Sequence, residues 1–251
     1  MILNFKEKKT NIFKNRPDAG EKLVQNFFNS LDSDEKSEED VGRFFVDVGA
    51  SSKADVEEMG IHPGTVITFN DDLMELGEKY YTGRALDNRI GGFIIAEVVR
   101  RIKEQKIILP FGLYTVNAVQ EEIGLRGAEM ISRRIKPDVA MITDVTHDTN
   151  SPMYDKKNNG DIKIGKGPTV SYAPAVQQNL RDLIVEVAEK NEIPFQRLAS
   201  SRFTGTDTDA FAYSGLGVAS ALISLPLKYM HTTVETVAKV DIEHVINLIF
   251  E

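Results

Sequence analysis

The stretch of sequence that decides the fold is Leu113-Tyr-Thr-Val-Asn-Ala-Val-Gln-Glu-Glu-Ile-Gly-Leu-Arg-Gly127. Its first half is apolar and typical of a strand, and its glycine-spaced second half indicates a turn into a helix. The carboxylate pair Glu121-Glu122 stands between the two halves. Adjacent side chains at a strand end point in different directions. One carboxylate could therefore bind a metal while the other faces a substrate, although paired acids also occur in solvated surface turns.

Strand and helix patterns alternate on both sides of this stretch. Apolar side chains recur at helical spacing in four segments, and four short apolar runs have the length and composition of strands. This alternation predicts an α/β fold with a mixed, mostly parallel central sheet flanked by helices. The predicted helices cover residues 90–102, 128–135, 176–190 and 237–250, and the predicted strands cover residues 113–119, 139–145, 196–198 and 217–223.

The first 78 residues have a different character. Residues 1–42 are polar and charged, and we expect them to be partly disordered. Short apolar runs at residues 44–48 and 66–69 predict strands, and Ser52 with Asp55 predicts a capped short helix between them. The sequence therefore predicts a small β-rich domain over residues 1–78 and a larger α/β domain over residues 79–251.

Composition limits the classes of function. The chain of 251 residues carries 30 basic and 38 acidic residues, a formal charge of −8, which argues against general binding of nucleic acid or of an anionic membrane. It has no cysteine, and hence no disulfide and no thiolate ligand. No apolar run approaches the roughly 20 residues that span a bilayer, and the N-terminus becomes charged too early for a signal peptide. We expect a soluble cytoplasmic protein with neither nucleic-acid nor membrane partners.

Four polar clusters follow predicted strands or precede predicted helices. They contain Asp87, the pair Glu121-Glu122, Asp144 and His231. Alone, Asp87 could cap a helix and His231 could be a structural histidine. In open α/β sheets, however, functional groups gather at the carboxyl ends of strands. Carboxylates with an imidazole suit Zn²⁺, Co²⁺ or Mn²⁺, and Glu121 would then be free to act as a general base.

The clusters together resemble the tetrahedral, dodecameric di-metal aminopeptidases, a family that includes glutamyl and deblocking aminopeptidases and some members named endoglucanases. The resemblance covers roughly residues 43–250. It implies a zinc-peptidase-like catalytic domain over residues 79–251 that lacks its N-terminal segment, next to an incomplete small domain. The matching stretches are Phe45-Val-Asp-Val-Gly-Ala50, Gly60-Ile-His-Pro-Gly64, Gly83-Arg-Ala-Leu-Asp-Asn-Arg89, Gln120-Glu-Glu-Ile-Gly-Leu-Arg-Gly-Ala128, Thr143-Asp-Val-Thr146, Thr204-Gly-Thr-Asp-Thr-Asp-Ala210 and Tyr229-Met-His-Thr-Thr-Val-Glu235.

The resemblance also implies a role for each site residue. It makes Asp87 the carboxylate that bridges two metal ions and Glu121 the general base. It makes Glu122 and His231 ligands of one metal ion, and Asp144 a ligand of the other. It further implies a cis peptide bond after Asp87 and a substrate-side loop over residues 204–210, to which no specific role is assigned.

The chain departs from the family pattern at the second metal. The family has a His-x-Asp motif upstream of its small domain, whereas no histidine here precedes His62, which lies where the family has no ligand. The site of Asp87, Glu122 and His231 is thus expected to be complete, and the site of Asp87 and Asp144 to lack its imidazole. His147 is a candidate substitute. The sequence could be part of a longer active protein, a truncated inactive one, or an enzyme with a mono-metal or rebuilt site.

The leading hypothesis is a metal-dependent aminopeptidase with two divalent ions, zinc or cobalt, acting on peptides within a large homo-oligomer. One alternative is a catalytically impaired relative that serves as an oligomeric scaffold or peptide binder. Another is a different di-metal hydrolase, such as a deacylase or carboxypeptidase. A glucanase is weakly supported, because the chain has no tryptophan to stack on a sugar. The sequence does not indicate which N-terminal residue is preferred.

Overall fold

The computed structural model describes residues 46–70, 72–152 and 154–251. It divides into two units, one ending at Phe69 and the other spanning Asn70–Glu251. The division falls before the hairpin of β1 (Met74–Leu76) and β2 (Tyr80–Gly83), whereas the sequence predicted a boundary after residue 78, between these two strands. The hairpin joins the larger unit because β2 pairs with β7 (Glu235–Ala238).

In the first unit, the described residues contain the helix α2 (Lys53–Glu58). Ser52 caps it as predicted, since its Oγ accepts a hydrogen bond from the Asp55 backbone N–H at 3.2 Å and donates one to the Asp55 carboxylate at 2.7 Å. Residues 46–48 and 66–69 form no strand, contrary to the sequence prediction, because no described segment pairs with them. Residues 1–42, together with Phe44 and Phe45, lie outside the described part of the chain.

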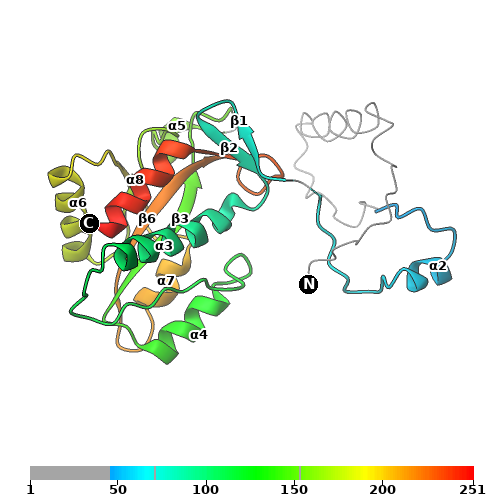
Figure 1. Cartoon of the computed structure of the whole chain (residues 1–251), viewed down its shortest axis with the longest axis horizontal. Coiled ribbons are helices and arrows are strands. Elements are labelled where there is room, and N and C mark those ends of the chain that lie inside the picture. The colour runs from blue at the N-terminus through cyan, green and yellow to red at the C-terminus, as the bar shows by residue number, and fades with distance from the viewer. Residues whose placement is uncertain (1–45, 71, 153) are drawn as a thin grey trace. The chain divides into compact units, whose positions relative to one another are not determined.

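The larger unit is built on a seven-stranded sheet (Figure 1). Its longest strand, β6 (Ala219–Lys228), pairs in parallel with the whole of β3 (Val139–His147). Successive parts of β6 pair antiparallel with β4 (Thr169–Tyr172) and with β7. The edges are completed by β5 (Gln196–Ala199), which is parallel to β4, and by the β1–β2 hairpin, which is antiparallel to β7.

The sheet is mixed, as predicted. Of the six pairings, those of β3 with β6 and β4 with β5 are parallel and include the longest one, and the other four are antiparallel. Each antiparallel pairing involves β1, β2, β4 or β7, which are three or four residues long and are not predicted by the sequence. In particular, β7 returns antiparallel from β6 after the turn at residues 229–234.

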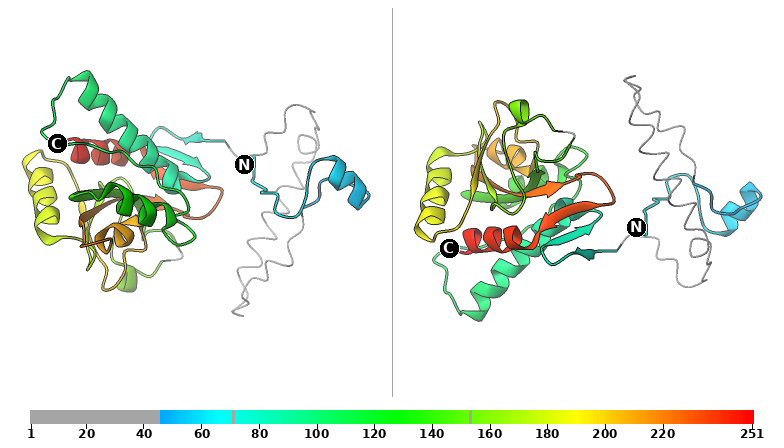
Figure 2. Two further views of the ribbon diagram at one scale, coloured as in Figure 1. Left: turned by 90° about the horizontal axis from the view of Figure 1, so that it is seen from below. Right: turned by 90° about the horizontal axis from the view of Figure 1, so that it is seen from above.

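Helices cover both faces of this sheet (Figure 2). On β6, Ile223, Leu225 and Leu227 belong to a core cluster with α3, α6 and α8, whereas Leu222 belongs to a second cluster with α4 and α7. This alternation follows from the two-residue period of a strand. The helices are α3 (Leu86–Glu104), α4 (Arg126–Ile135), α6 (Gln178–Lys190), α7 (Asp207–Ala212) and α8 (Lys239–Phe250), and a short α5 (Lys156–Asn159) lies in a loop.

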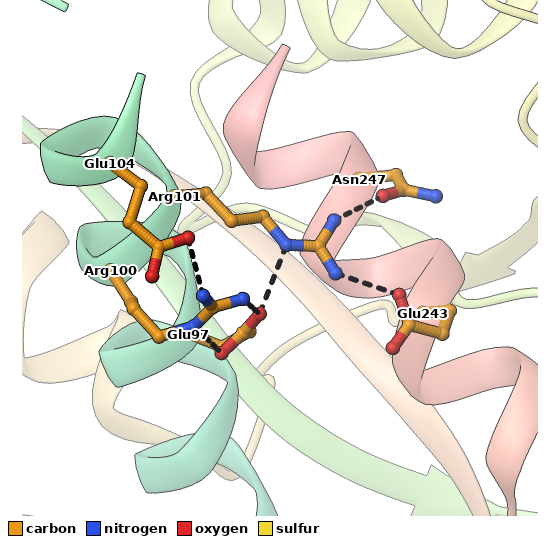
Figure 3. A network of polar contacts seen from close by, with 6 residues as sticks. All are labelled: Glu97, Arg100, Arg101, Glu104, Glu243 and Asn247. Carbon is orange, nitrogen blue, oxygen red and sulfur yellow. Dashed lines mark hydrogen bonds and ion pairs between the residues drawn. The ribbon is translucent and has the colours of Figure 1, made fainter. Parts of the chain in front are cut away.

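A polar network joins α3 to α8 (Figure 3). The Arg101 guanidinium donates to the Asn247 side chain at 2.7 Å, to Glu243 at 2.8 Å and to Glu97 at 3.1 Å. Arg101 is mostly covered, with its side chain 23% exposed, so these bonds restrain its long side chain. The network fixes the far end of the helix whose first turn carries Asp87.

The predicted strand at residues 113–119 is the main difference in the larger unit. It forms no strand pairing, and the described part of β3 pairs with β6 alone. The segment instead lies against α4, where the Gly127 backbone N–H donates to the Val119 carbonyl at 2.9 Å. Apolar side chains such as Leu113 and Tyr114 are exposed there. Within the described residues, no helix is both long enough and apolar enough to cross a membrane.

Candidate metal centre

The predicted site residues meet at one end of the sheet. Strand β7 is antiparallel to both β2 and β6, and β3 is parallel to β6, so β2, β3 and β6 run in the same direction. Asp87 follows β2, Asp144 lies in the second half of β3, and His231 follows β6. The carboxyl ends of these strands therefore bring the three side chains to a common edge, as the sequence predicted.

Asp87, Glu122 and His231 form a compact group with the chemistry of a metal site. One ligand atom from each lies within 4.8 Å of the others. The His231 Nε2 atom is 3.1 Å from the Asp87 Oδ2 atom and 3.4 Å from the Glu122 Oε2 atom. Ligands about 2.1 Å from a tetrahedral Zn²⁺ ion lie about 3.4 Å apart. The donor set therefore fits a divalent cation of that size.

Asp87 is positioned by an irregular start to α3. Ala85 has a left-handed backbone with φ of 54°, and Asp87 and Asn88 depart from helical dihedral angles. The peptide bond between Asp87 and Asn88 is cis, as the resemblance implied. The Asn88 side-chain amide donates to the Thr143 carbonyl at 2.9 Å. This bond ties the first turn of α3 to β3 next to Asp144.

The Glu121-Glu122 pair lies in a tight turn that precedes α4. The backbone N–H groups of Gly124 and Leu125 both donate to the Glu121 carbonyl at 3.0 Å. Glu121 is partly buried, whereas Glu122 is exposed. Both line a cavity of about 590 Å³. The remaining lining residues are Gly124, Leu125, Glu129, Arg133, Phe203, Gly205, Asp209, Ala210, Tyr213 and Ser214.

Burial and mutual repulsion raise the pKa values of three of these carboxyl groups. Burial, followed by the charge of Glu122, raises the pKa of Asp87 to about 6. Burial, followed by the charge of Asp207, raises the pKa of Glu121 to about 7. Burial raises the pKa of Asp144 to about 8, although its hydrogen bond from the Val145 N–H opposes this shift. A bound cation would stabilise the charged forms of these carboxyl groups, whose ionisation burial and mutual repulsion oppose.

The second predicted metal position has fewer ligands. Asp144 is buried, with 8% of its surface exposed, and Asp87 and Glu121 are near enough to raise its pKa. No histidine joins it in the part of the chain that the structure describes. His147 ends β3, and its Nδ1 atom lies 2.6 Å from the Tyr154 hydroxyl. Burial, followed by the charge of His231, lowers the pKa of His147, which places it near the centre without making it a ligand.

Two acidic residues near the centre received no role from the sequence. Asp207 begins α7, where one of its carboxylate oxygens is buried without a hydrogen-bond partner among the described residues. Glu235 begins β7 and is almost completely buried. Both lie within stretches that carried the family resemblance. In the sequence, only their positions within these motifs could have indicated a role for Asp207 and Glu235, and Glu235 also follows His231 by four residues.

Comparisons with known proteins show which family the chain resembles. Residues 20–248 match the family model described as M42 glutamyl aminopeptidase. A lysyl aminopeptidase of Pyrococcus furiosus is 39% identical over 207 residues, which cover 81% of this chain and 57% of the relative. A TET aminopeptidase structure from a marine sediment Thaumarchaeota archaeon is 32% identical with a TM-score of 0.75, and it covers 81% of this chain and 57% of that one.

A second structure bears on assembly. PhTET1-12s, described as a dodecamer, is 29% identical with a TM-score of 0.67, and the match covers 81% of this chain and 59% of that one. The present chain thus spans a little under three fifths of the length of each of these three proteins.

Proposed function

Since this chain belongs to the M42 glutamyl aminopeptidase family, we propose that it takes part in removing N-terminal residues from peptides by metal-assisted hydrolysis. The observation that carries the proposal is the convergence of Asp87, Glu122 and His231, with Glu121 beside them at the cavity. The lysyl and glutamyl aminopeptidases among its relatives are longer proteins, so the activity of the whole protein belongs to the proposal.

Asp87, Glu122 and His231 would hold one divalent cation, zinc or cobalt. Asp87 would also face a second cation, together with Asp144. A bound cation supplies Lewis-acid polarisation of the scissile carbonyl. No described histidine forms a ligand group with Asp144; His147, the candidate nearby, has its Nδ1 atom 2.6 Å from the Tyr154 hydroxyl.

Glu121 would carry the proton in this reaction. Its carboxylate is partly buried, next to the ligand group but outside it. A carboxylate in this position would accept a proton from the attacking water and return the proton to the leaving amine.

The cavity would bind the N-terminal end of the peptide. Among its charged lining residues, Glu121, Glu122, Glu129 and Asp209 are acidic, and Arg133 alone is basic. Arg133 is paired with Glu129 at 2.5 Å, so its charge is already compensated. The resulting negative field suits a free α-amine, which distinguishes an aminopeptidase from a deacylase or a carboxypeptidase.

The proposal is tested by metal content and by matched substrates. We expect purified protein to bind Zn²⁺ or Co²⁺ and to hydrolyse a peptide with a free N-terminus in preference to the same peptide with an acetylated N-terminus. Glu121→Gln should reduce kcat by about 10²- to 10⁴-fold while metal content stays unchanged. Preference for the acetylated peptide would instead indicate a deacylase. Full metal binding without any hydrolysis would favour the scaffold or peptide binder.

We also propose that the chain associates with copies of itself. PhTET1-12s, a relative of the same fold, is a dodecamer, and the described part of this chain exposes apolar side chains along residues 107–119. Light scattering coupled to size-exclusion chromatography should give a mass several times the 28.0 kDa of one chain. A monomer at all accessible concentrations would contradict this proposal and leave the metal site unaffected.

A further inference from the structure

Glu235 lies behind the metal ligands with both carboxylate oxygens directed at their backbones. Its Oε2 atom accepts a hydrogen bond from the Asp87 N–H at 3.0 Å, and its Oε1 atom accepts one from the His231 N–H at 2.7 Å. The side chain is only 2% exposed. We infer that Glu235 is a positioning residue, which sets the spacing of Asp87 and His231 so that both reach one cation. The inference rests on the proposed metal-dependent function.

The two ligands need such a connection because neither lies in a regular element. Asp87 occupies the kinked start of α3, with φ of −79° and ψ of 108°, and the N-cap residue of that helix provides no side-chain hydrogen bond. His231 lies in the turn between β6 and β7 with φ of 63°, a left-handed conformation that is uncommon for a residue other than glycine. One rigid carboxylate joins these two irregular segments.

Glu235 acts through the ligands and not as one of them. The compact group of ligand atoms consists of Asp87, Glu122 and His231, without Glu235. Both of its oxygens already accept charge-assisted hydrogen bonds from backbone N–H groups, which are the stronger kind. Because Glu235 belongs to β7, whose four residues are all buried, the sheet itself determines where the carboxylate lies. Groups behind metal ligands commonly determine metal affinity in this way.

Asp241 provides a matched control for a merely structural role. It too is a buried carboxylate, 0% exposed, and it accepts hydrogen bonds from the backbone N–H groups of Gly165 and Gly167. It lies in the first turn of α8 and does not contact the ligand group. Replacing either carboxylate by its amide turns one acceptor into a donor facing a backbone N–H. Loss of stability is therefore expected from both Glu235→Gln and Asp241→Asn.

The test measures both the Zn²⁺ affinity and the Tm of each variant of the full chain. We expect Glu235→Gln to weaken Zn²⁺ binding, measured by calorimetry, by about 10- to 100-fold and to shift the visible absorption bands of the Co²⁺-loaded protein. Asp241→Asn should lower Tm comparably but bind Zn²⁺ within twofold of the wild type. Glu235→Asp, which retains the charge but is one methylene shorter, should give an intermediate affinity, and it decides the question if Glu235→Gln does not fold.

Two results would overturn the inference in distinguishable ways. If the wild type binds Zn²⁺ and the folded Glu235 variants bind it equally well with unchanged Co²⁺ spectra, the positioning role is wrong and the proposed function stands. If the wild type binds no more Zn²⁺ than Asp87→Asn does, the proposed function fails and the positioning role fails with it.

Discussion

Glu121 and Glu122 are neighbours in the chain but have different surroundings. The Glu122 carboxylate lies 3.4 Å from the His231 ring, in the ligand group. Glu121 is more buried, and its pKa is raised by burial and then by Asp207, from the N-terminus of α7. The turn at residues 121–125 therefore gives two adjacent acids the different surroundings that their proposed roles, metal ligand for Glu122 and proton carrier for Glu121, require.

The influence of Asp207 on Glu121 gives a prediction at this scale. In metal-free protein, Asp207→Asn should lower the pKa of Glu121 below its value of about 7, because a negative charge near the carboxylate is removed. A ¹³C NMR titration of the side-chain carboxyl carbon would measure the change, with Glu121→Gln to assign the signal. The matched control is Asp209→Asn, since the Asp209 carboxylate is engaged by the N–H groups of Thr204 and Gly205. An unchanged titration in Asp207→Asn would show that Asp207 does not contribute to the raised pKa.

The sequence predicted those elements that carry a complete periodic signal. The helices α3, α6 and α8 and the strand β3 lie within a few residues of their expected positions. Each helix contributes regularly spaced apolar side chains to one core cluster, and β3 contributes Ala140 and Ile142 to one cluster and Val145 to the other. The sequence does not predict the four-residue β7, and the predicted helix over residues 237–250 begins inside it. A segment of that length has too few residues to show a two-residue period, and its strand state depends on pairing with β2 and β6.

Residues 113–119 show the opposite error, a strand that the sequence predicts and the structure does not form. Its composition favours a strand, but strand formation requires a partner that the described chain does not place beside it. The site was more predictable than the sheet, because Asp87, Glu122, Asp144 and His231 each stand in a motif at a strand or helix end. Glu235 and Asp207 could not be assigned from their motifs, since their importance lies in contacts between distant segments.

The packing of α4 gives a prediction at the scale of an element. A Cβ atom on Gly127 would lie 2.5 Å from both the backbone N and O atoms of Val119, so Gly127→Ala must push α4 away from the segment that leads to Glu121 and Glu122. Overpacking of this kind costs about 1–3 kcal/mol of stability. We expect a lower Tm together with weaker Zn²⁺ binding by calorimetry.

The control is Gly112→Ala, where the added Cβ would have only an ordinary contact of 3.7 Å with the Tyr114 ring. Equal effects of the two substitutions would contradict the prediction.

At the scale of the whole molecule, the metal centre links β2, β3, β6 and the turn before α4. Three of its carboxyl groups, Asp87, Glu121 and Asp144, have raised pKa values of about 6, 7 and 8 in the absence of a cation. Model carboxyl groups titrate near pH 4, so the unfolded chain loses these protons at lower pH than the folded chain does. These carboxyl groups therefore oppose folding without a cation, and the proposed cation would offset this cost.

The sign of the resulting pH dependence can be predicted. Between pH 5 and 8 the metal-free folded state holds more protons on these carboxyl groups than the unfolded state, so their contribution to the free energy of unfolding falls as pH rises. We expect the Tm of chelator-treated protein to decrease from pH 5 to pH 8. Added Zn²⁺ should raise Tm more at pH 8 than at pH 5, because at pH 5 protons compete for the same carboxylates.

Asp144→Asn removes the carboxyl group with the highest of the three pKa values and should reduce this decrease of Tm with pH. A metal-free Tm that instead increased steadily over this range would show that these carboxyl groups ionise freely in the folded protein, and that no cation is needed to hold them together.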